Sequence, residues 1–325
     1  MDEVLLTPFL RLLDDIATPA AVRGFEAGDD RGIWTKLSQS GFLDALVCER
    51  DGGAGLQPGD VAELLLASAQ RLLPAPFAET MIARALATRA GIELPRSPIL
   101  LWPQNAQGKL CSSLAPARAG ATHALVQRDD KLSLQELSAS AAPTDGYGFV
   151  AAALSEAAPL ASFALEPGAL LSWSATLAAI AMTGAMTGVL DMTVDHVNTR
   201  EQFGRKLGQF QAIQQQVALM AELTTSASIA ARTALSRPLP GPSRLDAAAA
   251  KIAANEAARI VCASAHAAHG AIGVTAEHNL QLYIRRIKRA AVSFGASGFW
   301  ADLIGEVHLT QGDDAGDFVR AHWSV

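Results

Sequence analysis

The chain has 325 residues, a formal net charge of −6 and a sequence pI near 5.7. This length allows two or three domains. The acidic balance argues against nucleic acid as the main partner, because a phosphate backbone requires a basic protein face. Residues Met1–Val4 place no basic region before an apolar run, so we expect no secretion signal. Cys48, Cys111 and Cys262 lie far apart without C-x-x-C spacing, which fits a reducing compartment. These features indicate a cytoplasmic protein.

Residues 1–96 are predicted to form an N-terminal helical domain. Trp34, Leu37 and Phe42 recur at helical spacing, and Val61–Leu66 begins a second apolar run. Between them, residues 52–55 contain three glycines. We expect a plain turn there rather than a phosphate-binding loop, because no strand precedes the glycines as such a loop requires.

Residues 97–166 have a different composition, with short segments that favour β-strands. Ile99–Trp102 is one such segment. His123–Gln127 and Leu132–Leu134 flank the polar residues 128–131, a pattern typical of strand, turn and strand. We predict a small, reduced β middle domain.

Residues 167–325 are predicted to form a C-terminal four-helix bundle. One apolar stripe at helical spacing comprises Ile213, Val217, Met220 and Leu223. Residues 237–242 contain three prolines, so this segment must be a loop. Ser243 and Asp246 resemble a capping box that opens a long alanine-rich helix ending near His269. The whole chain is therefore expected to be mostly α.

The start of this bundle raises a membrane question, because residues 167–190 contain no charged side chain. That length could span a bilayer. Small and polar residues interrupt it, namely Ser172, Ser174, Thr176, Thr183, Gly184, Thr187 and Gly188. We therefore favour a central helix that is buried on most sides within the bundle.

A short break between two helical segments contains cations, glycines and an aromatic residue. Arg200, Arg205 and Lys206 lie there with Phe203 and Gly204. The free carbonyl groups at a helix end favour nearby cations, and glycine lets a ligand approach the backbone. Because arginine binds phosphate oxygens in a bidentate way, the break could hold an anionic cofactor. The alternative interpretation treats the arginines as ordinary helix-end charges and Phe203 as a core aromatic.

The same passage resembles a known family. Residues 200–211 are similar to the R-x-Q-F-G and F-Q flavin-contacting segments of acyl-CoA dehydrogenases. Residues 267–277 resemble the second cofactor segment of that family, Q-x-H-G-G-x-G-x-T-x-E. The order of residues 34–56 is similar to its N-terminal helical domain. The resemblance implies an acyl-CoA dehydrogenase-like fold and a role in flavoprotein oxidoreduction and lipid metabolism.

In that family FAD lies across a subunit interface, and this resemblance assigns roles to individual residues. Arg200 would contact the pyrophosphate, with Gln202 and Phe203 packed beside it. Gln211 would reach the adenosine side, and the backbone at 270–273 would supply N–H donors. The second segment contributes the implied contact residues Ala267, His269, Gly270, Ala271 and Gly273.

In the second segment, two residues differ from the family pattern, and both differences affect how tightly a cofactor is expected to bind. Ala267 replaces the glutamine of the family, which removes a hydrogen bond worth about 1 kcal/mol. Ala271 replaces a glycine and is tolerable only where φ is negative. We therefore expect contact with a cofactor, but no tight site made by this chain alone.

The catalytic carboxylate of the family is missing. The reaction removes a proton from the carbon beside the thioester, so a carboxylate must lie within hydrogen-bond reach of that proton. Most members place a glutamate after the last bundle helix, at a position that falls on Phe294. Others place it on the first bundle helix, at a position that falls on Ser174. Neither residue is a base, and the Gly-Ser-Asp motif of the middle domain is also absent.

One subgroup of the family pairs a catalytic chain with a short degenerate chain in an α2β2 assembly that acts on steroid side chains. Residues 273–283 are similar to the G-x-T-W-E-H-x-x-H-L-Y of that subgroup, although Ala276 and Gln281 replace the tryptophan and the second histidine. The resemblance implies a homologous catalytic partner that binds most of the acyl-CoA, and electron-transferring flavoprotein as the acceptor.

Three functions stay open on the sequence. The chain is a non-catalytic subunit that completes the FAD site of a partner, a self-sufficient dehydrogenase with an atypical base, or a flavin-free helical interaction protein. Glu277 and Asp191 are the candidate atypical bases, although a structural acid and a solvated or paired acid are the simpler interpretations. His266 and His269 lie three residues apart, but no carboxylate or cysteine in the sequence pattern completes a metal site with them.

Overall fold

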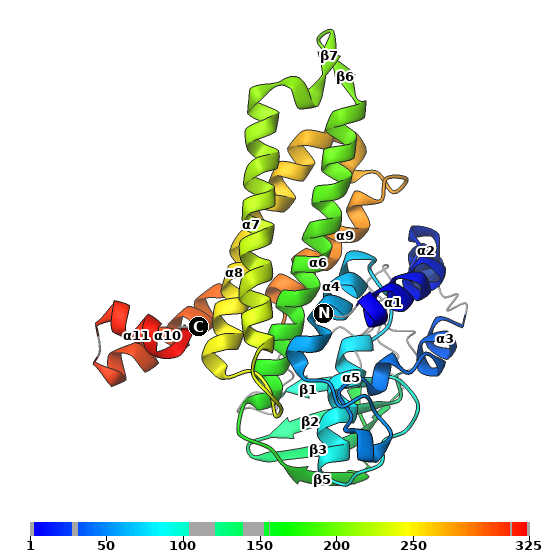
Figure 1. Ribbon diagram of the computed structural model, residues 1–325, viewed down its shortest axis with the longest axis vertical. Helices are drawn as coiled ribbons and strands as arrows, with labels where there is room; N and C mark the ends of the chain where they lie inside the picture. The colour runs from blue at the N-terminus through cyan, green and yellow to red at the C-terminus, as the bar shows by residue number, and fades with distance from the viewer. Residues whose placement is uncertain are drawn as a thin grey trace.

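The computed structural model describes residues 3–27, 32–103, 121–138, 153–155, 157–312 and 314–323. A long helical bundle follows the long axis, with a small sheet at one end and the N-terminal helices packed beside it (Figure 1). The expected mostly α fold with a small β region is thus confirmed. Cys111 lies outside the described residues. The domain boundaries at 96/97 and 166/167 stay a prediction.

The N-terminal region is helical, as expected. Its helices are α1 (Glu3–Ile16), α2 (Pro19–Ala27), α3 (Ile33–Gln39), α4 (Ala62–Gln70) and α5 (Phe77–Arg89), with 3-10 turns η1 (Phe42–Asp44), η2 (Glu49–Asp51) and η3 (Pro58–Val61). The ring of Phe9 lies at their centre. Its centroid is 5.0 Å from that of Phe77 in a stacked arrangement and 4.8 Å from that of Phe42 in an edge-on arrangement. Residues 52–55 form a turn, in which a side chain at Gly53 would collide with the carbonyl oxygen of Val47.

The sheet lies beneath the bundle and confirms the expected strands. Its strands are β1 (Ile99–Pro103), β2 (His123–Arg128), β3 (Lys131–Ser138), β4 (Ala153–Leu154) and β5 (Ala161–Ala164). β1 pairs parallel with β2, β2 pairs antiparallel with β3, and β4 and β5 both pair with β3. The Thr80 hydroxyl ties α5 to β1, since it accepts from the Ile99 N–H at 2.9 Å and donates to the Ile99 carbonyl.

The C-terminal region is the bundle. Its elements are α6 (Ala169–Thr199), β6 (Glu201–Gln202), β7 (Arg205–Lys206), η4 (Leu207–Gln209), α7 (Gln211–Leu235), α8 (Arg244–His269), η5 (Gly270–Val274), α9 (Leu280–Val292), α10 (Ser297–Gln311) and α11 (Ala315–Trp323). Helices α6 to α9 pack together, whereas α10 and α11 extend to one side (Figure 1). The Ser243 hydroxyl accepts from the Asp246 N–H at 3.1 Å, so the expected cap of α8 is confirmed.

Helix α6 is the central helix of the fold. It is the one described helix long and apolar enough to cross a bilayer, but 67% of its most apolar window is buried inside the protein. The side chain of Trp173 is fully buried and donates from Nε1 to the Pro240 carbonyl at 2.6 Å. A side chain at Gly184 would collide with the Leu66 carbonyl oxygen of α4. The preferred interpretation of residues 167–190 as a bundle helix therefore agrees with the structure.

We expect Gly184→Val to lower the free energy of unfolding by about 1–3 kcal/mol, because the added side chain must push α4 and α6 apart. Gly305→Val on α10 is the matched control, since a Cβ there meets nothing within 4 Å. Urea unfolding of the two variants measures the difference. Equal stability would show that α4 and α6 can separate at this point without cost.

Candidate functional site

A two-stranded hairpin joins α6 to α7 and projects beyond the bundle (Figure 1). Helix α6 ends at Thr199, and the N–H of the capping residue Arg200 donates to the His196 carbonyl at 2.9 Å. Strands β6 and β7 then pair around a two-residue turn of Phe203 and Gly204, with φ of 54° and 79°. Both turn residues have positive φ, as the tightest hairpin turns require. Phe203 is strained in this position, since only glycine adopts it freely.

The hairpin exposes the residues that the first flavin-contacting segment predicts. Arg200, Gln202 and Gln211 are exposed, and Phe203 is 89% exposed. The alternative interpretation of Phe203 as a core aromatic is therefore wrong, because the turn that reverses the chain holds the ring away from the bundle. The guanidinium of Arg205 lies 3.9 Å from the centroid of the Phe210 ring, a cation–π contact that orders the hairpin base. Another molecule can reach this surface directly.

The second cofactor segment begins where α8 ends. Gly270 follows His269 with φ 63° and ψ −146°, and the backbone then enters η5. Ala271 lies in η5 and does not have a positive φ, so alanine fits in place of the family glycine. Ala267, Gly270 and Ala271 are exposed. Gly273 is buried, and a Cβ there would lie 3.0 Å from both His269 and Leu280.

Stacked histidines join the two segments. The His196 ring of α6 lies 4.4 Å from the His269 ring of α8, and the His278 ring lies 5.0 Å from His269. Burial lowers the pKa of His196 and of His278, which favours neutral rings in this stack. His269 is 5% exposed and bonds the Ala265 carbonyl through Nδ1, while its Nε2 has no hydrogen-bond partner among the described residues. The stack places both predicted segments at the same end of the bundle.

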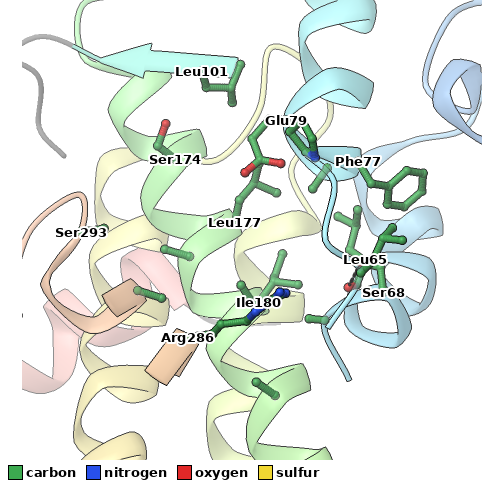
Figure 2. A pocket seen from close by; sticks show the side chains of 18 of the residues that line it. Leu65, Ser68, Phe77, Glu79, Leu101, Ser174, Leu177, Ile180, Arg286 and Ser293 are labelled. Carbon is green, nitrogen blue, oxygen red and sulfur yellow. Dashed lines mark hydrogen bonds between the residues drawn. The ribbon is translucent and has the colours of Figure 1, made fainter. Parts of the chain in front are cut away.

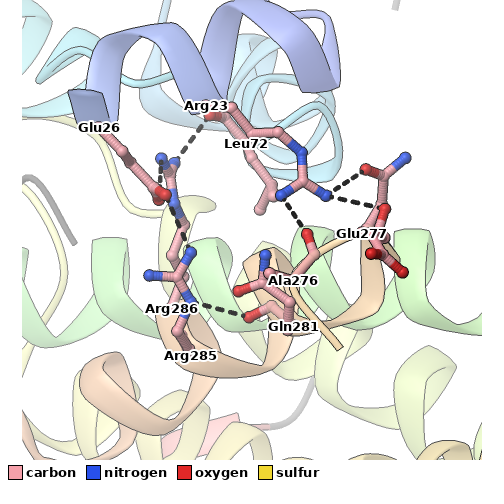
Figure 3. A network of polar contacts seen from close by, with 9 residues as sticks. Arg23, Glu26, Leu72, Ala276, Glu277, Gln281, Arg285 and Arg286 are labelled. Carbon is pink, nitrogen blue, oxygen red and sulfur yellow. Dashed lines mark hydrogen bonds and ion pairs between the residues drawn. The ribbon is translucent and has the colours of Figure 1, made fainter. Parts of the chain in front are cut away.

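An arginine from the N-terminal region fixes the loop after the second segment. Arg23 of α2 donates to the carbonyl of Ala276 at 2.6 Å and to Oδ1 of Asn279 at 3.0 Å (Figure 3). On the same helix, Glu26 forms an ion pair with Arg285 of α9 at 2.9 Å. These bonds join α2 to residues 276–279 and to α9, so the N-terminal region fixes the loop that follows η5.

A cavity of about 230 Å³ lies between α4, α5, α6 and α9, close to β1 (Figure 2). Ser174 of α6 and Phe294 after α9 both line it. The resemblance places the family base at these two positions, and the structure brings them to one cavity although 120 residues of sequence separate them. The Ser174 hydroxyl is buried without a hydrogen-bond partner among the described residues. Neither side chain can accept a proton from a carbon acid.

A carboxylate that the sequence interpretation missed enters this cavity. Glu79 lies in the first turn of α5, and its side chain points towards α6 near Ser174 and Leu177 (Figure 2). Burial raises the pKa of Glu79, opposed only by a hydrogen bond from its own backbone N–H. An acid in the first helical turn usually indicates a favourable interaction with the helix dipole. Because this pattern is common, Glu79 was not recognised from the sequence as a functional candidate. The two prolines before α5 were the only signal that the chain turns inward there.

The other candidate acids lie away from this cavity. Asp191 is exposed on α6 and accepts from Nε2 of Gln70 at 2.9 Å. Glu277 is exposed beside a second hollow, which Asp195 and His196 also line. Within the part of the chain that the structure describes, no group of three His, Cys, Asp or Glu side chains could hold a metal ion.

Glu79→Gln is expected to have a higher free energy of unfolding than the wild type at pH 8. The difference between the two proteins should be smaller at pH 5. Because the folded carboxyl has a raised pKa, the folded state binds more protons than the unfolded state above about pH 4.5. The free energy of unfolding of the wild type therefore falls as the pH rises through this window, whereas the amide has no such dependence. Urea unfolding at both pH values measures this, and a difference that does not change with pH would contradict the assignment.

Comparison with known proteins assigns the chain to a family. Residues 168–309 match the model of the acyl-CoA dehydrogenase C-terminal domain. The chain is 30% identical over 287 residues to the acyl-CoA dehydrogenase IpdE2 of Mycobacterium tuberculosis (strain ATCC 25618 / H37Rv), covering 85% of this chain and 87% of that protein. The chain belongs to the acyl-CoA dehydrogenase family. The expected family is thereby confirmed, whereas the roles of the residues in the two cofactor segments stay predictions. Membership makes the chain part of a family of flavin-dependent oxidoreductases that bind FAD.

Solved structures agree with this membership. A Tcur3481-Tcur3483 steroid ACAD variant superimposes with a TM-score of 0.78 at 25% identity, covering 95% of this chain and 97% of that one. The ChsE4-ChsE5 complex from Mycobacterium tuberculosis contains a chain with the same TM-score at 21% identity, covering 97% and 99%. The second likeness concerns the fold alone. Each of the two names gives two components, and the second name calls its structure a complex.

Proposed function

We propose that this acyl-CoA dehydrogenase family member is the non-catalytic subunit of a two-chain dehydrogenase, and that it completes the FAD site of a catalytic partner chain. The hairpin is the observation that supports this proposal most strongly. Arg200 and the 89% exposed Phe203 project from the bundle, so they can reach a cofactor held by another chain. The paired chains of the ChsE4-ChsE5 complex and the steroid ACAD support a partner of the same family.

The residues of the two segments suit the dinucleotide part of FAD. Arg200 would pair with the pyrophosphate, Gln202 and Phe203 would pack beside it, and Gln211 would reach the adenosine. The N–H of Gly270 donates to the His266 carbonyl, so the N–H groups at the start of η5 are the ones that would bind an anion at this end of the bundle. The bound flavin would supply hydride acceptance, while these side chains bind and orient its far end.

The two positions at which the resemblance places the family base support the non-catalytic assignment. The family base positions are occupied by Ser174 and Phe294, which cannot take a proton from the substrate. The partner would bind most of the acyl-CoA thioester and contribute the base for α,β-desaturation, and electron-transferring flavoprotein would accept the electrons. The steroid ACAD relative supports an acyl group attached to a steroid side chain.

Co-expression with a full-length acyl-CoA dehydrogenase chain encoded beside it tests the proposal. We expect the two chains to co-purify with flavin absorbance that neither keeps when purified alone. Flavin bound stoichiometrically to this chain alone would favour a self-sufficient dehydrogenase with an atypical base. A colourless chain that pairs with no dehydrogenase would favour a flavin-free interaction protein.

A further inference from the structure

The loop that connects η5 to α9 is held by one arginine from the other end of the sequence. Arg23 of α2 donates from Nη1 to the Ala276 carbonyl at 2.6 Å, across 253 residues of sequence. Its Nη2 donates to the Glu277 carbonyl at 3.3 Å and to Oδ1 of Asn279 at 3.0 Å (Figure 3). A single side chain from the N-terminal region therefore bonds to most of this short loop.

Stabilisation of α9 does not account for Arg23. Asn279 is the capping residue at the N-terminal end of α9, and a cation beside that end of a helix opposes the helix dipole. The carbonyl groups of Ala276 and Glu277 precede the helix, and they are acceptors that a guanidinium can bond favourably. The contact therefore stabilises the loop rather than the helix.

The loop and the start of α9 pack closely against η5. A Cβ at Gly273 of η5 would lie 3.0 Å from both His269 and Leu280, so these elements have little space to shift against one another. His278 of the loop accepts from the Leu280 N–H at 3.1 Å through Nδ1, and its ring lies 5.0 Å from the His269 ring. A displacement of the loop would therefore displace η5 as well.

Burial of its own side chains holds η5 in place only weakly. Gly273 is its one buried residue, whereas the side chains of Ile272 and Val274 are 49% and 68% exposed. Because a segment gains free energy from the apolar surface that it removes from water, η5 gains little in this way. Its arrangement depends instead on the two segments that flank it, namely the end of α8 and the loop that Arg23 holds.

We propose that Arg23 is a positioning residue of the FAD site, which holds the second cofactor segment in its binding arrangement through the loop and without contact with the cofactor. This inference rests on the proposed function and deepens it. It gives the N-terminal helix α2 a part in cofactor binding that neither cofactor segment contains.

Amide hydrogen exchange of the full chain alone tests the positioning in the absence of flavin. We expect Arg23→Ala to speed the exchange of peptides that cover residues 270–280 by about fivefold or more, because the loop then opens more often. Glu26→Gln is the matched control, since Glu26 lies on the same helix and pairs with Arg285 of α9. The control should leave exchange at residues 270–280 within about twofold of the wild type.

Rescue by a small cation separates the bonds of Arg23 from general loosening of α2. Methylguanidinium should restore slow exchange in Arg23→Ala, because it reproduces the planar fork of donors that the variant lacks. An equal concentration of methylammonium supplies the same charge without the fork, so it should restore less. Equal effects of the two cations, or no effect of either, would contradict a role of the guanidinium bonds.

Titration of the complex with FAD, followed by flavin fluorescence, tests the consequence for the cofactor. The complex contains this chain and its catalytic partner. We expect the FAD dissociation constant to rise about tenfold in Arg23→Ala, the effect of one hydrogen bond to a charged group, and to stay within about twofold in Glu26→Gln. Thermal unfolding of each variant establishes that it is folded. If Arg23→Ala does not fold, Arg23→Gln replaces it and is judged by the same criteria.

Three results would overturn the inference. They are unchanged exchange at residues 270–280 in Arg23→Ala, an equal increase in Glu26→Gln, or an FAD affinity of Arg23→Ala that matches the wild type while Arg200→Ala binds FAD more weakly. The last of these leaves the proposed function standing. Equal FAD affinity in the wild type and Arg200→Ala would instead contradict the proposed function itself, and with it this inference.

Discussion

Arg200→Ala is expected to remove most of the flavin from the complex of this chain with its catalytic partner, while both chains stay folded. The guanidinium of Arg200 is exposed, and none of the described residues forms a hydrogen bond or an ion pair with it. Its removal should therefore cost little folding stability. A charge-assisted hydrogen bond to phosphate contributes about 1.5–3 kcal/mol, so we expect flavin binding to weaken by roughly 10- to 150-fold.

The flavin-to-protein absorbance ratio of the complex after gel filtration measures this effect. Arg259→Ala is the matched control, because Arg259 is an exposed arginine on α8 whose ion pair joins it to Glu256 one turn away. That control complex should keep its flavin. If the Arg200→Ala complex retained the same flavin content as the control, the assigned role of the hairpin would be contradicted.

Lys251→Met is expected to change stability by several kcal/mol in a way that depends on pH. Lys251 is fully buried in α8, where Nζ donates to Oδ1 of Asn255 at 2.9 Å and to the Ala291 carbonyl at 3.0 Å. Burial lowers the pKa of Lys251 from 10.5 to about 7. A shift of this size corresponds to about 5 kcal/mol of cost for the buried charge. Methionine has a similar length and no charge, although it leaves two acceptors without a donor.

The direction in which the free energy of unfolding changes with pH follows from proton binding by Lys251. Between pH 7 and 10.5 the unfolded chain keeps the Lys251 proton and the folded chain has released it, so the free energy of unfolding of the wild type rises with pH. We expect Lys251→Met to be the more stable protein at pH 6. Its advantage should shrink by about 1.4 kcal/mol for each pH unit above 7.

Urea unfolding at pH 6, 7.5 and 9 measures the difference between the two proteins. Lys288→Met is the control, because Lys288 is exposed on α9 and its ammonium group stays in water. A difference between Lys251→Met and wild type that is constant across these pH values would show that the buried amine keeps its proton throughout.

Local patterns in the sequence were sufficient to predict most of the helices and the central strands. The Ser243 cap and the proline-rich loop before it have short-range causes, and the structure contains both. The two β-favouring segments on either side of the polar residues 128–131 likewise predicted β2 and β3. The central position of α6 followed from its composition, because small and polar residues suit contacts with α4 and α9 more than contacts with lipid.

Features that depend on distant contacts could not be predicted. The cavity exists because α4, α5, α6 and α9 converge, and no local pattern places Glu79 beside Ser174. The exposure of Phe203 depends on the positive φ of a phenylalanine, which sequence statistics disfavour. The stack of His196 on His269 joins elements more than 70 residues apart, so the meeting of the two segments had to come from the family resemblance.

The central claim is that this chain binds FAD held in the site of a partner chain and does not itself desaturate an acyl-CoA. Flavin absorbance and acyl-CoA-dependent dye reduction by this chain, purified free of any other dehydrogenase and supplied with excess FAD, test it most directly. We predict a colourless protein without turnover, and activity that appears when the catalytic chain is added. Stoichiometric FAD together with sustained turnover by the chain alone would contradict the account.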